Sequence, residues 1–255
     1  MSELIDKTAD GATSVDDCRG PLIRGWATIA FVILAEGIRD AVDLGLDSAP
    51  LQALGAAHYF WHAVIITLSW AVPIAVLVIA VRSAGGSLRD YFAWRRPRTG
   101  DVVFAIVAIL LLQALGVGLV YVTTGQLGFA ADQYRADMAA GMSPWWYVLR
   151  TWPALVYAPF VEESIYRGFL WRGLAPSRGG NFRTLLLTSL LFAGIHWRYY
   201  LQGCQFDVPA FVSPFIVGLV MGWIRWRSGS TVASMIGHSL SNLCLPVGAI
   251  LAASL

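Results

Sequence analysis

The chain has 255 residues, of which 57% are hydrophobic and only 13% are charged. A soluble globular domain carries about 25% charged residues, so this composition argues against a water-soluble core and indicates a lipid environment. The mean hydropathy of +0.62 points the same way. The net charge of +2 gives no sign of nucleic-acid binding, and we predict no nucleic-acid partner. Cys18, Cys204 and Cys244 are too few and too widely spaced for a disulfide framework.

The first twenty residues are polar and mildly acidic, and they lack the apolar core of a signal peptide. We therefore predict two parts: a disordered cytoplasmic tail over residues 1–20, and a single transmembrane bundle over residues 21–255.

Several apolar stretches follow, and a spanning helix needs roughly 20 mostly apolar residues. The predicted spans are Leu22–Gly37, His58–Val81, Val102–Thr123, Trp145–Trp171, Thr184–Trp197, Val208–Ile224 and Ser230–Leu255. The predicted fold class is therefore all-α, a polytopic membrane helix bundle of about seven transmembrane helices.

Arginines are concentrated in alternate connections, at residues 82–100, 172–183 and 225–229. Basic residues in short loops stay on the cytoplasmic side of a membrane, so this pattern predicts a cytoplasmic N-terminus. The segment Arg95–Arg98 is read as a topology signal that contacts anionic lipid. Aromatic residues at 145–147 and 197–200 are then expected at the outer interface.

Ionisable residues inside the predicted spans are the strongest functional signal. A charged group at bilayer depth costs about 2.5–3.5 kcal/mol on insertion scales, so such residues are functional candidates. Three clusters stand out: Glu162–Arg167 with the pattern EExxxR, Phe192–His196 with FxxxH, and His238–Asn242 with HxxxN. A fourth, Glu36 with Arg39 and Asp40, is interpreted as self-pairing at a helix end.

Helical geometry separates the two adjacent glutamates. Glu163 and Arg167 are four residues apart, so they lie on one helix face and are predicted to form an ion pair. Glu162 points about 100° away and is expected to face the bundle interior.

The other two motifs have the same four-residue spacing. Phe192 shares a helix face with His196, and His238 shares one with Asn242. A buried carboxylate and an imidazole can hold a water and accept its proton. A second imidazole and an amide can donate to a developing oxyanion. The sequence has no GxSxG motif, and no activated nucleophile is evident.

Together these motifs resemble the CAAX-protease and bacteriocin-processing family (CPBP, also called Abi), which includes the type II CAAX prenyl endopeptidases. The resemblance covers roughly residues 145–245, the predicted protease core. It implies an intramembrane protease of the glutamic type. Separately, we expect no metal or other cofactor, because Asn242 is a poor zinc ligand and a good oxyanion donor.

The resemblance also implies roles for the individual residues. Glu162 is expected to be the general base and His196 to position the water, while His238 and Asn242 form the oxyanion site. The supporting residues are Glu163, Arg167 and Phe192.

The implied substrate is a membrane-associated protein or peptide, lipidated or not, processed at a CAAX-type C-terminus or a propeptide. The expected location is the bacterial inner membrane.

Three alternatives stay open at this stage. Two histidines and a glutamate are ligand types of catalytic zinc, although the usual HExxH helix is absent. Intramembrane Glu and His also relay protons in ion-coupled transporters, but the inverted repeats of such proteins are not evident. The third alternative is a non-catalytic scaffold or immunity protein with the same fold. His58 and His62 are expected to have no catalytic role.

Overall fold

The computed structural model describes residues 23–46, 69–127, 130–149, 151–176, 180–202 and 205–254. In chain order the helices are α1 (Trp26–Leu46), α4 (Ala71–Ser83), α5 (Leu88–Phe92), α6 (Thr99–Thr124), α7 (Ala131–Ala139), α8 (Pro144–Leu149), η2 (Pro153–Tyr157), α9 (Ala158–Glu163), η3 (Ser164–Leu170), α10 (Trp171–Leu174), α11 (Phe182–Gly194), α12 (Trp197–Tyr200), α13 (Val208–Ser228) and α14 (Thr231–Ala253). Strands β1 (Leu201–Gln202) and β2 (Gln205–Phe206) form a short antiparallel pair.

Some of the sequence predictions lie outside the described residues. These are the tail over residues 1–20, the first part of the predicted span from His58, the histidines His58 and His62, and the cysteines Cys18 and Cys204.

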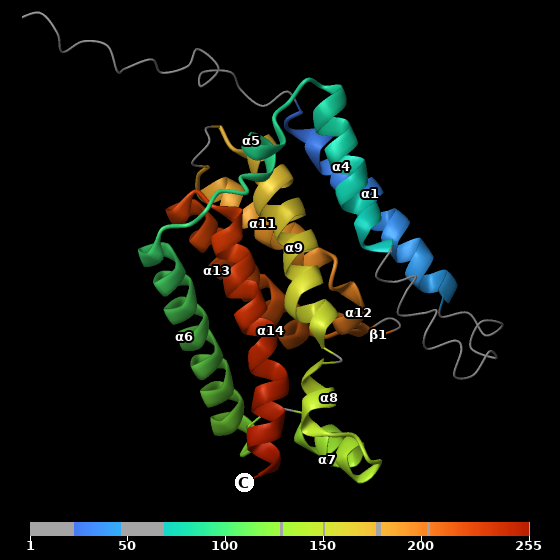
Figure 1. Cartoon of the computed structure of the whole chain (residues 1–255), viewed down its shortest axis with the longest axis vertical. Coiled ribbons are helices and arrows are strands. Elements are labelled where there is room, and N and C mark those ends of the chain that lie inside the picture. Colours follow the sequence, from blue (N-terminus) through green and yellow to red (C-terminus); the bar gives the residue numbers. More distant parts are fainter. Residues whose placement is uncertain are drawn as a thin grey trace, which may run out of the picture.

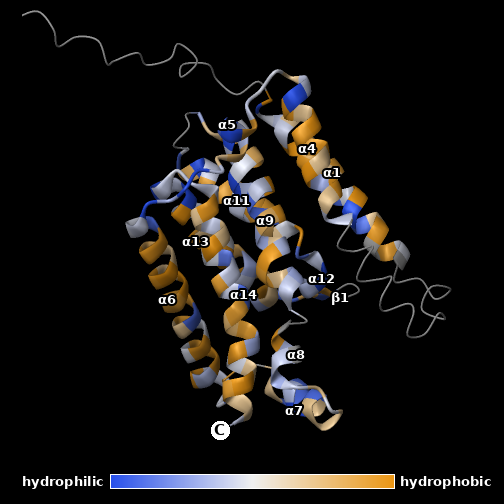
Figure 2. Cartoon of the chain, viewed as in Figure 1, coloured by the Kyte–Doolittle hydropathy of each residue, from blue (hydrophilic) through white to orange (hydrophobic). Residues whose placement is uncertain are grey.

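Three of the described helices are long and apolar enough to cross a membrane, namely α6, α13 and α14, and α4 and α11 are shorter apolar helices. Only 11% of the most apolar stretch of α6 is buried, and many of its large apolar side chains are exposed, Leu111, Leu115 and Leu119 among them. Figure 2 shows the hydrophobic residues along its length. A surface this apolar favours lipid as its surroundings. Seven spans and a cytoplasmic N-terminus stay predictions.

Polar side chains mark where three of the helices begin. Asn181, Asp207 and Ser230 precede α11, α13 and α14, and each side chain accepts a hydrogen bond from the backbone N–H three residues later. This bond satisfies one of the free N–H groups of the first helical turn. Gly229 ends α13 with a φ of +65°, a conformation that costs glycine little.

A nearly continuous helical rod from Trp152 to Leu174 runs through the bundle and carries the EExxxR motif (Figure 1). Its two segments η2 and η3 are π-helical, whereas the sequence geometry assumed a regular α-helix. π-Helical turns are rare and are frequent at functional sites. Segment η3 is packed against α1, α4, α5, α11, α13 and α14, and all seven of its residues are buried. The bundle therefore assembles around this motif.

Helices α11 and α13 approach each other closely through small residues. A Cβ atom on Gly222 would lie 2.4 Å from Leu185 Cδ1, and one on Gly218 would lie 3.2 Å from the Cα of Ser189. The two glycines form a GxxxG pattern, which permits close backbone contact between helices in membranes. This packing sets the position of Phe192 at the far end of α11.

Candidate active site

The two glutamates of EExxxR lie at the end of α9, directly before η3. Glu163 is completely buried and Glu162 is 7% exposed. Burying a carboxylate is costly unless charges or hydrogen bonds compensate it. The partners of each glutamate therefore indicate what it can do.

Glu163 is held by two partners from different helices. Its Oε1 lies 3.2 Å from Arg167 Nη1 and 2.9 Å from His238 Nδ1. The predicted ion pair with Arg167 is thus confirmed. Because a carboxylate only accepts, Nδ1 of His238 is the donor in the second contact. Glu163 therefore joins the EExxxR motif to the HxxxN motif on α14.

Arg167 extends the same network to two further helices. Its Nη2 donates to the Gly218 carbonyl of α13 at 2.8 Å, and its guanidinium lies 4.5 Å from the ring centroid of Phe192 on α11. The Arg167 carbonyl accepts from Arg225 Nε at 2.9 Å and from Thr231 Oγ1 at 3.3 Å. These contacts fit the bracing role expected of Arg167, which stays a prediction.

Glu162 has different surroundings. Its buried Oε2 has no hydrogen-bond partner within the described part of the chain. The charge of Glu162 interacts with those of Arg167, Glu36 and Arg39. Glu163 Oε2 is unpartnered in the same way, and a buried acceptor oxygen of this kind suits a carboxylate that holds a water molecule.

The ring of Phe192 contacts both imidazoles. Its ring centroid lies 4.8 Å from that of His196 and 5.9 Å from that of His238. Helix α11 ends at Gly194, and His196 follows in the turn after it. His196 Nδ1 lies 2.8 Å from the Phe192 carbonyl, which only accepts, so Nδ1 is the donor in this contact; in a neutral ring Nε2 is then the acceptor nitrogen. Phe192 and His196 are thus in contact, but the prediction that they share a helix face is wrong, because α11 ends before His196.

Asn242 lies one turn beyond His238 on α14 and is partly buried. Its Nδ2 donates to the Ala154 carbonyl in η2 at 2.7 Å. A side-chain amide has two N–H donors, so a second remains for a ligand. The structure therefore ties Asn242 to the first turn of the central rod, a contact that the sequence did not indicate.

The fourth cluster differs from its sequence interpretation. Glu36 and Arg39 do pair, at 2.8 Å, but α1 continues to Leu46, so they do not lie at a helix end. Both are buried, and the Tyr166 hydroxyl donates to Glu36 Oε1 at 3.3 Å. Tyr166 belongs to the EExxxR motif, so α1 contributes charged groups beside the candidate site. The sequence does contain a sign of this contribution, because Glu36 and Arg39 lie inside an apolar segment. Self-pairing alone does not describe their contacts.

No group of three or more His, Cys, Asp or Glu side chains within the described ranges is arranged to hold a metal ion. The expectation that the reaction needs no cofactor stays a prediction.

The fold and the site together define a class: an integral membrane protein, mostly helical, with ionisable residues from several helices gathered in its interior. Residues 144–244 match the family model described as type II CAAX prenyl endopeptidase Rce1-like. The match confirms the resemblance predicted from the three motifs and supports an intramembrane endopeptidase. No curated protein and no solved structure matches the chain.

Proposed function

We propose that this protein is a glutamate-dependent intramembrane endopeptidase that cleaves a membrane-associated protein or peptide, lipidated or not. The observation that carries the proposal is the convergence of the three motifs. Glu163 contacts His238 across helices at 2.9 Å, and Phe192 contacts both imidazoles and Arg167. The bacterial inner membrane is the proposed location.

The proposed chemistry begins with a water molecule beside Glu162. Glu162 accepts a proton from this water while His196 Nε2 accepts its second hydrogen bond and orients it. The water oxygen attacks the carbonyl carbon of the scissile peptide bond. The proton then passes from Glu162 to the amide nitrogen, which leaves as an amine.

The carbonyl oxygen becomes an oxyanion during the attack and needs hydrogen-bond donors. Asn242 can use its second N–H for this purpose. His238 Nδ1 already donates to Glu163, so Nε2 donates only if the ring carries both protons. The Glu163 carboxylate accepts from Nδ1 and so fixes the orientation of this ring. We propose this supporting role for Glu163, whereas Glu162 is the general base.

The test is proteolysis by the purified full chain in liposomes, with membrane-tethered peptides that carry or lack a prenylated C-terminus. Glu162→Gln keeps the shape of the side chain and is expected to lower turnover at least about 100-fold. His196→Ala is expected to lower it as well. Asp132→Asn on the exposed surface of α7 is the matched control and should cleave like wild type. Undiminished cleavage by Glu162→Gln would contradict the mechanism.

Zinc hydrolysis and ion transport are two of the three remaining alternatives, and the same liposomes distinguish them. Cleavage that persists in a strong chelator supports the metal-free reaction, whereas loss of cleavage that only zinc restores supports a metalloprotease. Proton or ion flux without cleavage of any peptide would favour a transporter.

A further inference from the structure

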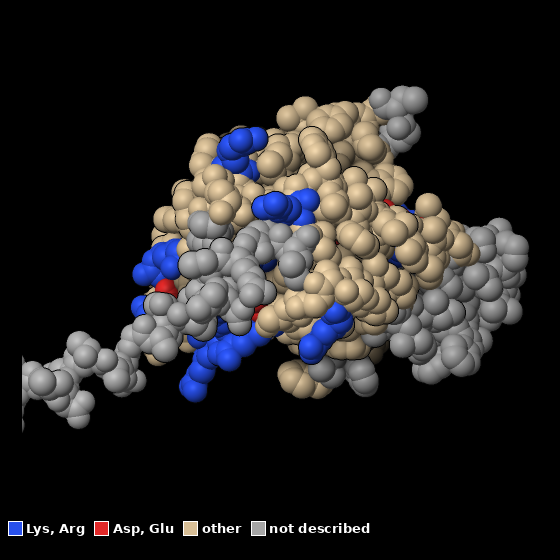
Figure 3. Space-filling model, turned by 90° about the horizontal axis from the view of Figure 1, so that it is seen from above, with Lys and Arg blue, Asp and Glu red and all other residues tan. Residues whose placement is uncertain are grey.

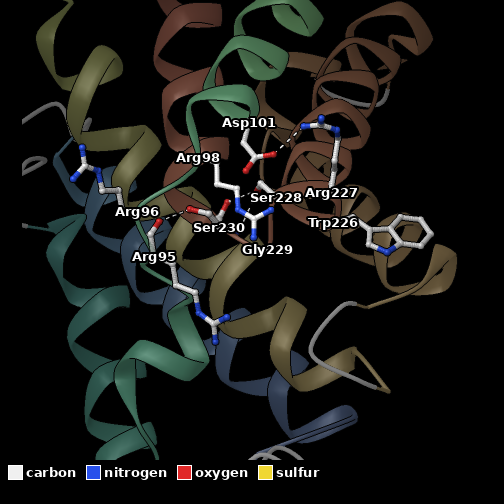
Figure 4. A pocket seen from close by; sticks show the side chains of 9 residues that line it. All are labelled: Arg95, Arg96, Arg98, Asp101, Trp226, Arg227, Ser228, Gly229 and Ser230. Atoms are coloured by element: carbon white, nitrogen blue, oxygen red, sulfur yellow. Dashed lines mark hydrogen bonds and ion pairs between the residues drawn. The ribbon is translucent and has the colours of Figure 1, made fainter. Parts of the chain in front are cut away.

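A basic pocket lies where α6 and α14 begin and α13 ends, apart from the candidate active site (Figure 4). The cavity measures about 380 Å³. Four arginines line it, Arg95, Arg96, Arg98 and Arg227, with Asp101 as the acidic member. Figure 3 looks onto this end of the molecule and shows arginine side chains on it. The pocket therefore favours an anion.

Backbone contacts hold the wall of this pocket in place. The Ser230 hydroxyl, which also caps α14, donates to the Arg95 carbonyl, and the Thr231 N–H donates to the Ala93 carbonyl at 3.1 Å. The segment before α6 is thereby attached to the start of α14. The arginines are presented by a fixed stretch of backbone and not by a free loop end.

The charges of the pocket are only partly balanced by protein groups. Arg227 Nη1 pairs with Asp101 Oδ1 at 2.9 Å, and its guanidinium lies 4.3 Å from the ring centroid of Phe104. Arg95 has a more distant partner, Asp90, at 4.0 Å. Arg98 extends across the pocket towards Ser228 and Gly229, whereas Arg95 and Arg96 extend to other sides (Figure 4). Arg98 and Arg227 are therefore the two guanidinium groups best placed for one anion.

A phosphate group is the anion that fits this arrangement. The planar guanidinium presents paired N–H donors that match two phosphate oxygens. Contacts with the side chains of Asp101 and Phe104 already hold the Arg227 guanidinium, so little of its freedom is lost on binding.

The surroundings of the pocket indicate that the phosphate belongs to a lipid. Trp223 and Trp226 at the end of α13 are 51% and 37% exposed, and indole side chains favour the membrane–water interface. Trp223 packs edge-on against Phe104 of α6, with ring centroids 5.0 Å apart. Exposed apolar side chains, Val103 and Val107 among them, continue along α6 from this point. A free phosphate would make no use of this surface, whereas acyl chains would cover it.

We propose that this pocket binds the phosphate group of an anionic phospholipid, with Arg98 and Arg227 as its contacts and the acyl chains along α6 and α13. The site is independent of peptide cleavage. The sequence indicated only a general contact between Arg95–Arg98 and anionic lipid. The proposal narrows this contact to one cavity and one bound lipid.

The test is native mass spectrometry of the full chain in detergent, titrated with phosphatidylglycerol, with phosphatidylcholine and with inorganic phosphate. Wild type is expected to retain one phosphatidylglycerol molecule in preference to phosphatidylcholine. Arg98→Gln should weaken this retention about tenfold, the loss expected for one charge-assisted contact. Arg98→Lys keeps the charge without the paired donors and should be intermediate.

Arg89→Gln is the matched control, since Arg89 is an exposed arginine on α5 at the same end of the molecule and does not line the pocket. It removes the same charge and should leave retention unchanged. An equal loss in Arg89→Gln would show a diffuse charge effect and overturn the proposal. Displacement of phosphatidylglycerol by millimolar inorganic phosphate would identify free phosphate as the ligand and would overturn the lipid assignment. The melting temperature of each variant confirms that it is folded.

Discussion

Replacing Arg167 by methionine would remove the guanidinium from the centre of the bundle and keep a side chain of similar length. Three contacts disappear with it: the ion pair with Glu163, the hydrogen bond to the Gly218 carbonyl and the contact with the Phe192 ring. The positive charge that interacts with Glu162 is lost as well. The backbone carbonyl of residue 167 remains, so its bonds from α13 and α14 are retained.

The expected loss of stability is large because Glu163 is completely buried. Removal of one partner of a buried ion pair leaves an uncompensated charge and costs about 3–5 kcal/mol. His238 still donates to Glu163, so the lower half of this range is expected. The double variant Arg167→Met with Glu163→Gln removes the buried charge as well and should recover part of the loss.

The assay is the free energy of unfolding of the purified chain in mixed micelles, followed by far-ultraviolet circular dichroism. Arg135→Met is the matched control, because Arg135 also pairs with an aspartate at 2.9 Å, but at an exposed position on α7. No measurable change is expected there, since exposed ion pairs contribute little. A loss below about 1 kcal/mol for Arg167→Met, or no recovery in the double variant, would refute the reasoning.

Two further predictions concern neighbouring contacts. Gly222→Val should destabilise the protein by about 1–3 kcal/mol, because its side chain would overlap Leu185. Gly194→Ala, at a helical glycine with open space around it, is the control and should not destabilise; equal losses in both would show that close packing of α11 on α13 is not the cause. Tyr166→Phe removes the donor to Glu36 and should cost about 1 kcal/mol of unfolding free energy. If the networks on α1 and on the central rod are coupled, the same variant should lower peptide turnover more than it lowers stability; unchanged turnover would contradict that coupling.

Sequence reasoning predicted correctly two contacts between residues four apart along the chain. Glu163 pairs with Arg167 where α9 continues into η3, and Phe192 contacts His196, although His196 lies in the turn after α11. The apolar character of α6, α13 and α14 was likewise readable, since hydropathy is a property of composition.

The tertiary structure decided which residues of different helices contact one another. The contact between Glu163 and His238 joins residues 75 positions apart, and Asn242 reaches Ala154 across 88. Such contacts depend on how each helix is rotated and how closely its neighbours approach. Small residues and π-helical turns set that rotation, and a residue-by-residue pattern does not express it. For the same physical reason, the sequence alone identified the candidate ionisable residues and the pairing of Glu163 with Arg167. Only the packed bundle decided that Glu163 also meets His238, that Asn242 meets Ala154, and where the arginines line a pocket.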